Sequence, residues 1–232
     1  MSDIFSTPAF LSQKALRERG IEVKRSLFHE FYASFFGYYH HREMLDDLDE
    51  IQFALTQRPL VVLQNHAAYL RMADRLKDQV RADQLQPVFE VVKANLLQVL
   101  PPTTFDDEDH LIKTYLADQI KQWLFDDANE EVVEAQTTVA AFCDVFVPDD
   151  LDFPDINQEH NDEWRGHFMA MLYHALPDGK PAYLEDQITT TTYIRAEKVG
   201  RVILSRDLEM RTVVTAFTPH AAMGGIPLYP KP

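Results

Sequence analysis

The chain has 232 residues, 46% of them hydrophobic, and its 37 Asp and Glu against 22 Lys and Arg give a formal net charge of -15. This composition can bury a sizeable core and excludes a disordered chain, while a single cysteine excludes a disulfide framework and a four-cysteine zinc module. The longest charge-free apolar stretch, 59–70, is too short for the roughly 20 residues of a membrane helix, and no signal peptide is visible. We therefore expect a cytoplasmic protein without membrane contact.

Apolar residues recur at helical spacing through the first half of the chain. Gly20 and Gly37 stand where the first two periodic segments end, as helix-ending glycines do. We predict a three-helix module over residues 1–52 and a helical region over residues 60–128, with helices at 8–19, 23–36, 41–51, 65–80, 84–100 and 108–125.

After Asn129 the spacing changes to the alternation typical of strands. The last two predicted strands are expected to pair with each other, and the predicted strands are 137–147, 165–176, 182–195, 201–206 and 210–217. Residues 129–232 would then form an antiparallel β region, either by itself or as one compact domain with residues 60–128. The fold class predicted is α+β, with an N-terminal helical half followed by a four- to five-stranded antiparallel sheet.

Both faces of the predicted strands carry apolar side chains. Phe168, Ala170 and Leu172 alternate with Met169 and Met171 along one strand. One face can pack on the helices, and the other needs a second layer or a partner chain. We therefore predict a homodimer.

The negative charge is concentrated in one segment. Residues 106–186 hold 21 Asp and Glu against four Lys and Arg, a net charge of -17, whereas the rest of the chain has a net charge of +2. Such a segment repels phosphate backbones and attracts basic partners, although short acidic runs also serve simply to keep a surface soluble. The candidate binding residues are Asp149, Asp150, Asp152, Asp155, Glu159, Asp162 and Glu163.

The first functional hypothesis is a non-enzymatic protein whose acidic surface binds a basic protein, for example a DNA-binding protein. Direct binding of the chain to nucleic acid is disfavoured by its charge. The alternative is a small hydrolase or nuclease that cleaves RNA without a metal, with histidine as the base and arginine on the phosphate. Its candidate catalytic residues are His167, His174, Arg195 and Arg201, unless these arginines pair with acidic residues across the sheet.

Motifs for cofactors and metals are missing from the chain. There is no Gly-x-Gly-x-x-Gly, no Gly-x-x-x-x-Gly-Lys and no Gly-x-Ser-x-Gly. The nine histidines do not form a His-Glu-x-x-His pattern. We therefore expect no cofactor and no metal site.

Residues 14–45 share a scattered pattern with a known module: Leu16, Gly20-Ile21, Val23, Ser26, Glu30, Ala33 and Gly37-Tyr38. The segment resembles a short helical module at the N-terminus of bacterial proteins, often plasmid- or phage-borne and sometimes labelled glyoxalase-related. The resemblance implies a bacterial, mobile-element origin. It implies no glyoxalase activity, because the metal-binding βαβββ repeats of that family are not recognisable here.

The same N-terminal segment supplies a third hypothesis, a DNA-binding regulator. Ala33 and Gly37 have the separation found in the tight turn of a helix-turn-helix. The helix that would then enter the DNA, residues 40–50, carries five acidic residues that would face phosphates. This charge disfavours the third hypothesis.

Overall fold

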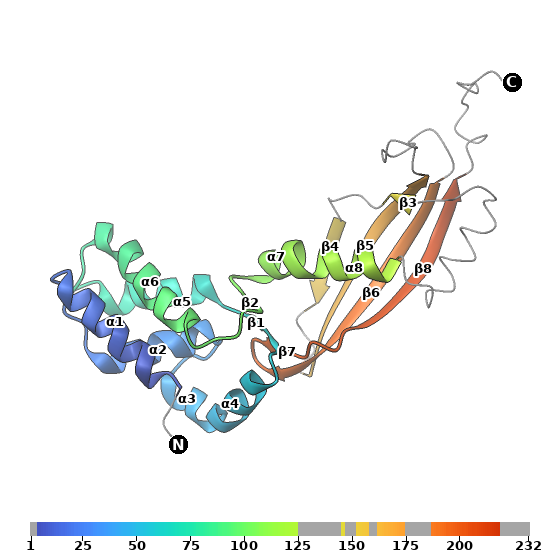
Figure 1. Cartoon of the computed structure of the whole chain (residues 1–232). Coiled ribbons are helices and arrows are strands. Elements are labelled where there is room, and N and C mark those ends of the chain that lie inside the picture. Colours follow the sequence, from blue (N-terminus) through green and yellow to red (C-terminus); the bar gives the residue numbers. More distant parts are fainter. Residues whose placement is uncertain (1–3, 125–144, 147–151, 158–161, 175–186, 219–232) are drawn as a thin grey trace, which may run out of the picture. The chain divides into compact units, whose positions relative to one another are not determined.

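The computed structural model of the chain describes residues 4–124, 145–146, 152–157, 162–174 and 187–218. The chain packs into two compact units, each built from separate parts of the sequence (Figure 1). The N-terminal unit comprises residues 1–111 and 197–206, and the C-terminal unit comprises residues 112–196 and 207–232. Strand β6 (Gln187–Gly200) gives its first ten residues to the C-terminal unit and its last four to the N-terminal unit.

Helices make up most of the N-terminal unit, and their bounds are α1 (Ser6–Glu18), α2 (Arg25–Phe35), α3 (His41–Asp46), α4 (Leu48–Thr56), α5 (Asn65–Leu76), α6 (Ala82–Leu97) and α7 (Glu108–Leu111). Gly20 and Gly37 have φ angles of 75° and 77°, which confirms that glycines end the first two helices. The segment predicted as one helix over 41–51 is divided at Asp47 into α3 and α4. No helix within the described residues is long and apolar enough to cross a membrane.

Aromatic side chains fill the core of the N-terminal unit. Helix α2 supplies Phe28, Phe31, Tyr32 and Phe35, none of which is exposed to solvent. The ring of Phe5 meets the ring of Tyr32 at a centroid distance of 6.0 Å. The hydroxyl groups of Tyr32 and Ser12 share a hydrogen bond of 3.0 Å, so this buried phenol has a partner.

A small sheet lies inside the N-terminal unit, where sequence reasoning predicted a helical region. Strand β1 (Leu60–Val62) pairs in parallel with β2 (Thr104–Phe105) and antiparallel with β7 (Ile203–Leu204). The predicted pairing of residues 201–206 with residues 210–217 is wrong, because β7 instead pairs with β1 and β6. Pairing with β1 places β7 beside Leu60 and Val61, which have no solvent exposure. Burial of these apolar side chains favours β1 over residues 210–217 as the partner of β7.

The C-terminal unit places a helix against strands. Its elements are the π-helical turn η1 (Ile112–Leu116), α8 (Ala117–Leu124), β3 (Val145–Phe146), β4 (Asp152–Asn157), β5 (Glu163–His174), residues 187–196 of β6, and β8 (Glu209–Thr218). Strands β3 and β4 both pair antiparallel with β5, β5 neighbours β6, and β8 pairs antiparallel with β6. Helices in the first half and this sheet in the second confirm the α+β class.

Side chains on one face of the C-terminal sheet form the interior of that unit. We call this the inner face; its buried members include Trp164, Phe168 and Leu172 of β5 and Ile188 and Ile194 of β6. Helix α8 contributes Trp123, whose Nε1 donates a hydrogen bond of 3.0 Å to the Thr212 hydroxyl. Thr212 also shares a 2.7 Å hydrogen bond with the hydroxyl of Thr192, so helix and sheet are joined by a buried polar chain.

Candidate functional site

The opposite face of the C-terminal sheet carries three of the described residues that sequence reasoning singled out, Glu163, His167 and Arg195. Along β5 the alternation that buries Phe168 leaves Met169 45% and Met171 46% exposed, and on β6 Tyr193 is 51% exposed. We call this the outer face; its further members are Glu163, Arg165, His167, Arg195, Glu209 and Arg211. It combines an exposed apolar patch with charged side chains at one end of the strands.

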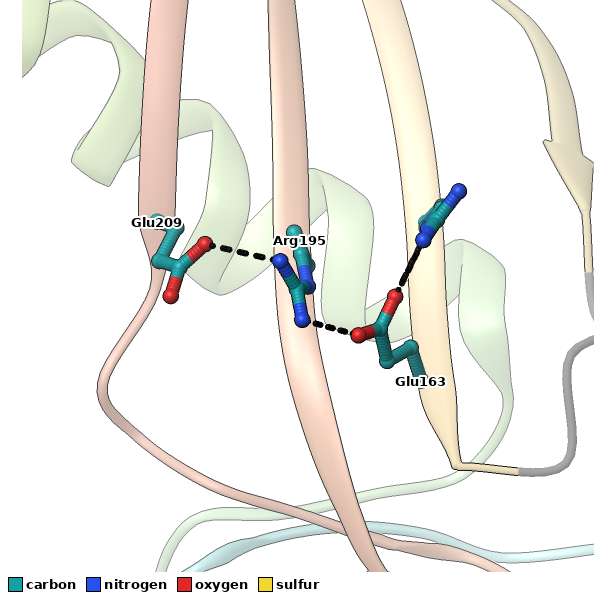
Figure 2. A network of polar contacts seen from close by, with 4 residues as sticks. Glu163, Arg195 and Glu209 are labelled. Carbon is teal, nitrogen blue, oxygen red and sulfur yellow. Dashed lines mark hydrogen bonds and ion pairs between the residues drawn. The ribbon is translucent and has the colours of Figure 1, made fainter.

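Three strands contribute to the charged end of the outer face. Arg195 of β6 lies between Glu163 of β5 and Glu209 of β8, and its guanidinium group pairs with both carboxylates (Figure 2). The Arg195 Nη1–Glu209 Oε2 distance is 3.4 Å. Arg165 donates to the second oxygen of Glu163 through Nε, at 2.8 Å, and through Nη2. One glutamate therefore holds two arginines, as a carboxylate with several acceptor sites can.

These arginines keep the Glu163 carboxyl charged at lower pH. Hydrogen bonds from Arg165 and the charges of Arg165 and Arg195 hold the pKa of Glu163 below its usual range. The positive charges of Arg165 and Arg195, whose side chains are half exposed, are in turn paired with carboxylates of the same unit. A substrate phosphate would have to compete with Glu163 for either arginine.

The two candidate histidines both lie on β5. The ring of His167 is partly exposed and lies 6.2 Å, between centroids, from the ring of Tyr193 on the neighbouring strand. His174 is the last residue of β5, with its backbone opposite Val145 of β3. His167 thus belongs to the outer face, between its charged end and its methionines.

Arg201, the fourth candidate catalytic residue, belongs to the N-terminal unit. Its Nη2 donates a 2.6 Å hydrogen bond to Glu43, and its guanidinium group lies 4.2 Å from the ring centre of Tyr38. The hydrogen bond from Arg201 is the largest cause that lowers the pKa of Glu43. Arg195 and Arg201 are therefore in different units, and each pairs with a glutamate of its own unit.

The candidate acidic residues divide into three groups. Asp149, Asp150 and Glu159 lie outside the described residues. Asp152 and Asp155 are backbone positions of β4, opposite Met169 and His167 of β5. Asp162 is exposed just before β5, and Glu163 is held by its two arginines.

Sequence reasoning did not find Glu209 or Arg165 as partners in this network. The only signal for them was the alternation of charge along the strands at Glu163-x-Arg165 and Glu209-x-Arg211. Cross-strand partners follow from the register, and the register that puts Arg195 opposite Glu209 depends on β8 pairing with β6.

Within the described part of the chain, no group of three or more His, Cys, Asp or Glu side chains is placed to hold a metal ion. No protein-family model matches the chain. No curated protein and no solved structure matches it either. The resemblance of residues 14–45 to a plasmid- or phage-borne module stays a prediction.

Proposed function

We propose that the protein is a non-enzymatic binding protein whose acidic segment, residues 106–186, contacts a basic macromolecular partner. The observation that carries the proposal is the division of charge between the two units. The C-terminal unit has 19 Asp and Glu against seven Lys and Arg, a net charge of -12, whereas the N-terminal unit has 18 against 15, a net charge of -3. A field of one sign attracts and orients an oppositely charged partner.

The arginines of the outer face support binding rather than catalysis. Arg165 and Arg195 point their donors at Glu163 and Glu209, which are carboxylates of the same unit. A nuclease needs such donors free for the phosphate that develops charge in the transition state. The nuclease hypothesis stays a prediction, and the geometry of its arginines gives it no support.

The DNA-binding hypothesis for the N-terminal helices also stays a prediction. The element that would enter the groove, α3, has only six residues, and its Glu43 is occupied by Arg201. The predicted homodimer stays a prediction as well, and its two C-terminal units would each bring a net charge of -12.

The test is binding of the full chain to poly-L-lysine at low and at high salt, because exposed charge pairs are screened by ions. We expect affinity to fall by at least about tenfold as the Debye length drops from about 30 Å to about 3 Å. Affinity that is independent of salt would contradict the proposal.

Two triple variants of equal charge give the matched control. Asp149→Asn, Asp150→Asn and Asp152→Asn together remove three charges from the acidic segment, and Asp46→Asn, Asp49→Asn and Glu50→Gln remove three exposed charges from the N-terminal unit. We expect the first variant to bind poly-L-lysine more weakly than the second. Equal loss in both would mean that total charge, and not the acidic segment, governs binding.

A further inference from the structure

The outer face of the C-terminal sheet brings exposed apolar side chains together on neighbouring strands. Met169 of β5 and Tyr193 of β6 are both about half exposed. The ring of Tyr193 lies 6.2 Å, between centroids, from the ring of His167 on β5. The alternation along each strand turns these side chains away from the inner face. A sheet face of this kind is usually covered by a second layer or by a partner chain.

Exposed apolar residues of the N-terminal helices lie on separate elements. Leu45, Phe53 and Leu70 belong to α3, α4 and α5 respectively. Tyr39 comes before α3, and the guanidinium group of Arg71 already lies 4.1 Å from the centre of its ring. Neighbouring strands lie about 4.8 Å apart, whereas packed helices have axes about 8–10 Å apart. The outer face therefore holds its apolar side chains closer together than separate helices do.

The charges of the outer face are nearly balanced, unlike those of the unit that carries it. Five charged side chains of β5, β6 and β8 lie on this face, namely Glu163, Arg165, Arg195, Glu209 and Arg211. Three bases against two acids give a net charge of +1. Counting Asp152 and Asp155 of β4, whose backbones pair opposite Met169 and His167, changes this to -1. The unit as a whole has a net charge of -12, so nearly all of its acidic excess comes from residues outside this face.

This balance determines which partner the outer face fits. A chain with charges of one sign would meet like charges on this face as well as opposite ones. A second copy brings the same apolar side chains and the same mixture of acids and bases, and a two-fold axis lets carboxylates of each copy meet guanidinium groups of the other. We infer that the protein forms a homodimer in which the outer faces of two C-terminal sheets pack against each other. The inference goes beyond the proposed function and does not depend on it.

Glu209 and Arg211 are the charged residues of this face with the most freedom to meet a second copy. The side chain of Glu209 is 73% exposed, and its ion pair with Arg195 is 3.4 Å long (Figure 2). Arg211 is exposed and forms no ion pair in the described part of the chain. Glu163 is much less exposed and already holds two arginines. In a two-fold dimer a contact between Glu209 and Arg211 of different copies would be made twice.

The acidic residues outside the face oppose this dimer, because each copy brings a C-terminal unit with a net charge of -12. Salt shortens the range of that repulsion, since the Debye length is about 30 Å at 0.01 M and about 3 Å at 1 M. Salt does not weaken contacts between apolar side chains in this way, and exposed ion pairs contribute little to binding. Salt should therefore strengthen the dimer, whereas it should weaken the binding of poly-L-lysine.

Sedimentation equilibrium of the full chain at low and at high salt is the first experiment. We expect a monomer–dimer equilibrium whose dissociation constant falls by at least about tenfold as the Debye length drops from about 30 Å to about 3 Å. A chain that stays monomeric at high salt overturns the inference. A dimer that salt dissociates overturns it too, because opposite charges and not apolar faces would then hold the copies together.

Hydroxyl-radical footprinting locates the interface. Oxidation of Met169 and Tyr193 should slow at protein concentrations that form the dimer, because both side chains become covered. Tyr39 and Phe53, exposed residues of the N-terminal unit, are the matched controls and should react at the same rate at every concentration. Protection of Tyr39 or Phe53 without protection of Met169 and Tyr193 assigns the dimer to the N-terminal unit and overturns the inference.

Two lysine variants test the face with the same change of charge. Met169→Lys places an ammonium group where the dimer excludes water, so we expect its dissociation constant to rise at least about tenfold. Phe53→Lys adds the same charge in the other unit and should leave the dimer unchanged. Met169→Leu keeps an apolar side chain and should restore dimerisation. Equal dissociation constants for the two lysine variants overturn the inference.

Fluorescence of Trp123 and Trp164, the two tryptophans of the chain and both in the C-terminal unit, shows whether Met169→Lys keeps its fold. If that variant unfolds, the footprint of the unmodified chain decides. Salt-sensitive binding of poly-L-lysine by a chain that stays monomeric overturns the dimer and leaves the proposed function standing. A dimer that binds no basic probe does the reverse. Poly-L-lysine that protects Met169 and Tyr193 on the monomer assigns the outer face to the basic partner, and this overturns the inference.

Discussion

The two units fill their interiors with different kinds of side chain. The N-terminal unit buries aromatic rings, and Ser12 and Ser34 are its buried polar residues among those described. The described part of the C-terminal unit buries four threonines, Thr190, Thr191, Thr192 and Thr212, beside its apolar residues. A buried hydroxyl costs free energy unless it has a partner, and in the second interior the hydroxyls of Thr192 and Thr212 hydrogen-bond to each other and Thr212 accepts from Trp123.

The units also use their ion pairs differently. In the N-terminal unit, Arg201 and Glu43 connect positions 158 residues apart in the chain. In the C-terminal unit, Arg195 and Glu163 connect neighbouring strands on a face that also carries Met169, Met171 and Tyr193. Both units also expose large hydrophobic side chains, such as Tyr39 and Phe53 in the N-terminal unit, so the two ion pairs differ mainly in sequence separation: 158 residues for Arg201 and Glu43, and 32 for Arg195 and Glu163.

The largest expected effect is the loss of an aromatic ring from the N-terminal core. Phe31→Ala should lower the free energy of unfolding of that unit by about 3–5 kcal/mol, because Phe31 has no solvent exposure and packs edge-on against Phe28. Urea unfolding followed by the helix signal in circular dichroism measures this change. Phe53→Ala is the matched control, since Phe53 is 69% exposed.

Tryptophan fluorescence sharpens the same experiment, because both tryptophans lie in the C-terminal unit. Units with cores of their own should respond separately, so Phe31→Ala should move the helix transition more than the fluorescence transition. An equal shift of both transitions would remove the distinction between the units.

The second largest effect is on the stability of the N-terminal unit, and it tests whether residues 197–206 pack as part of that unit. Ile203→Ala should cost about 2–5 kcal/mol, because Ile203 is fully buried where β7 pairs with β1. The loss should appear in the helix transition, although the residue lies late in the sequence. Val199→Ala, at a position 38% exposed, should have much less effect, and a loss seen only in fluorescence would contradict the assignment.

A smaller effect tests the polar interior of the C-terminal unit. Thr212→Val keeps the shape of the side chain but takes the hydroxyl away from Trp123 Nε1 and from Thr192, so we expect a loss of about 1–3 kcal/mol in the fluorescence transition. Thr215→Val removes an exposed hydroxyl from the same strand and should change stability by about 0.5 kcal/mol or less. Equal effects would mean that the buried hydroxyl chain contributes nothing specific.

The smallest effect is on the acid side of the stability profile. The pKa values of Glu43 and Glu163 are lowered in the folded protein, mainly by hydrogen bonds from Arg201 and Arg165 respectively. Their contribution to stability is therefore present above the unfolded pKa of a glutamate, about 4.3, and is lost as pH falls through the folded pKa.

Glu43→Gln and Glu163→Gln remove this dependence in one unit each. As the pH is lowered below about 4.3, the urea midpoint of each variant should fall less steeply than that of the unmodified chain. We expect this in the helix signal for Glu43→Gln and in the fluorescence signal for Glu163→Gln. Unchanged slopes in both variants would show that these ion pairs do not couple to folding.

Part of this molecule could be predicted from local sequence. Helical spacing with Gly20 and Gly37 predicted α1 and α2, and the alternation along 165–176 and 210–217 predicted β5 and β8. The same alternation predicted that Phe168 and Met169 lie on opposite faces of the strand, and the structure shows that Phe168 is the buried one. These features depend on one stretch of backbone at a time, because period and helix ends follow from neighbouring residues.

Some elements are too short for such patterns to reveal. Strands β1 and β2 have three and two residues, and a burial pattern of this length has no readable period. Strand β7 was predicted to pair with the chain that follows it, and its real partners are β1 and β6. A partner so distant in sequence is selected by the burial of Leu60 and Val61, which only the packed unit provides.

The candidate site divides in the same way. The sequence by itself determined that residues 106–186 concentrate the negative charge and that His167 and Arg195 belong to strands. Only the tertiary structure decided that Arg195 meets Glu163 and Glu209, and that Arg201 joins Glu43 in the other unit. Composition and periodicity are summed along the chain, whereas the partner of a charged side chain depends on strand register and on which distant segments pack together.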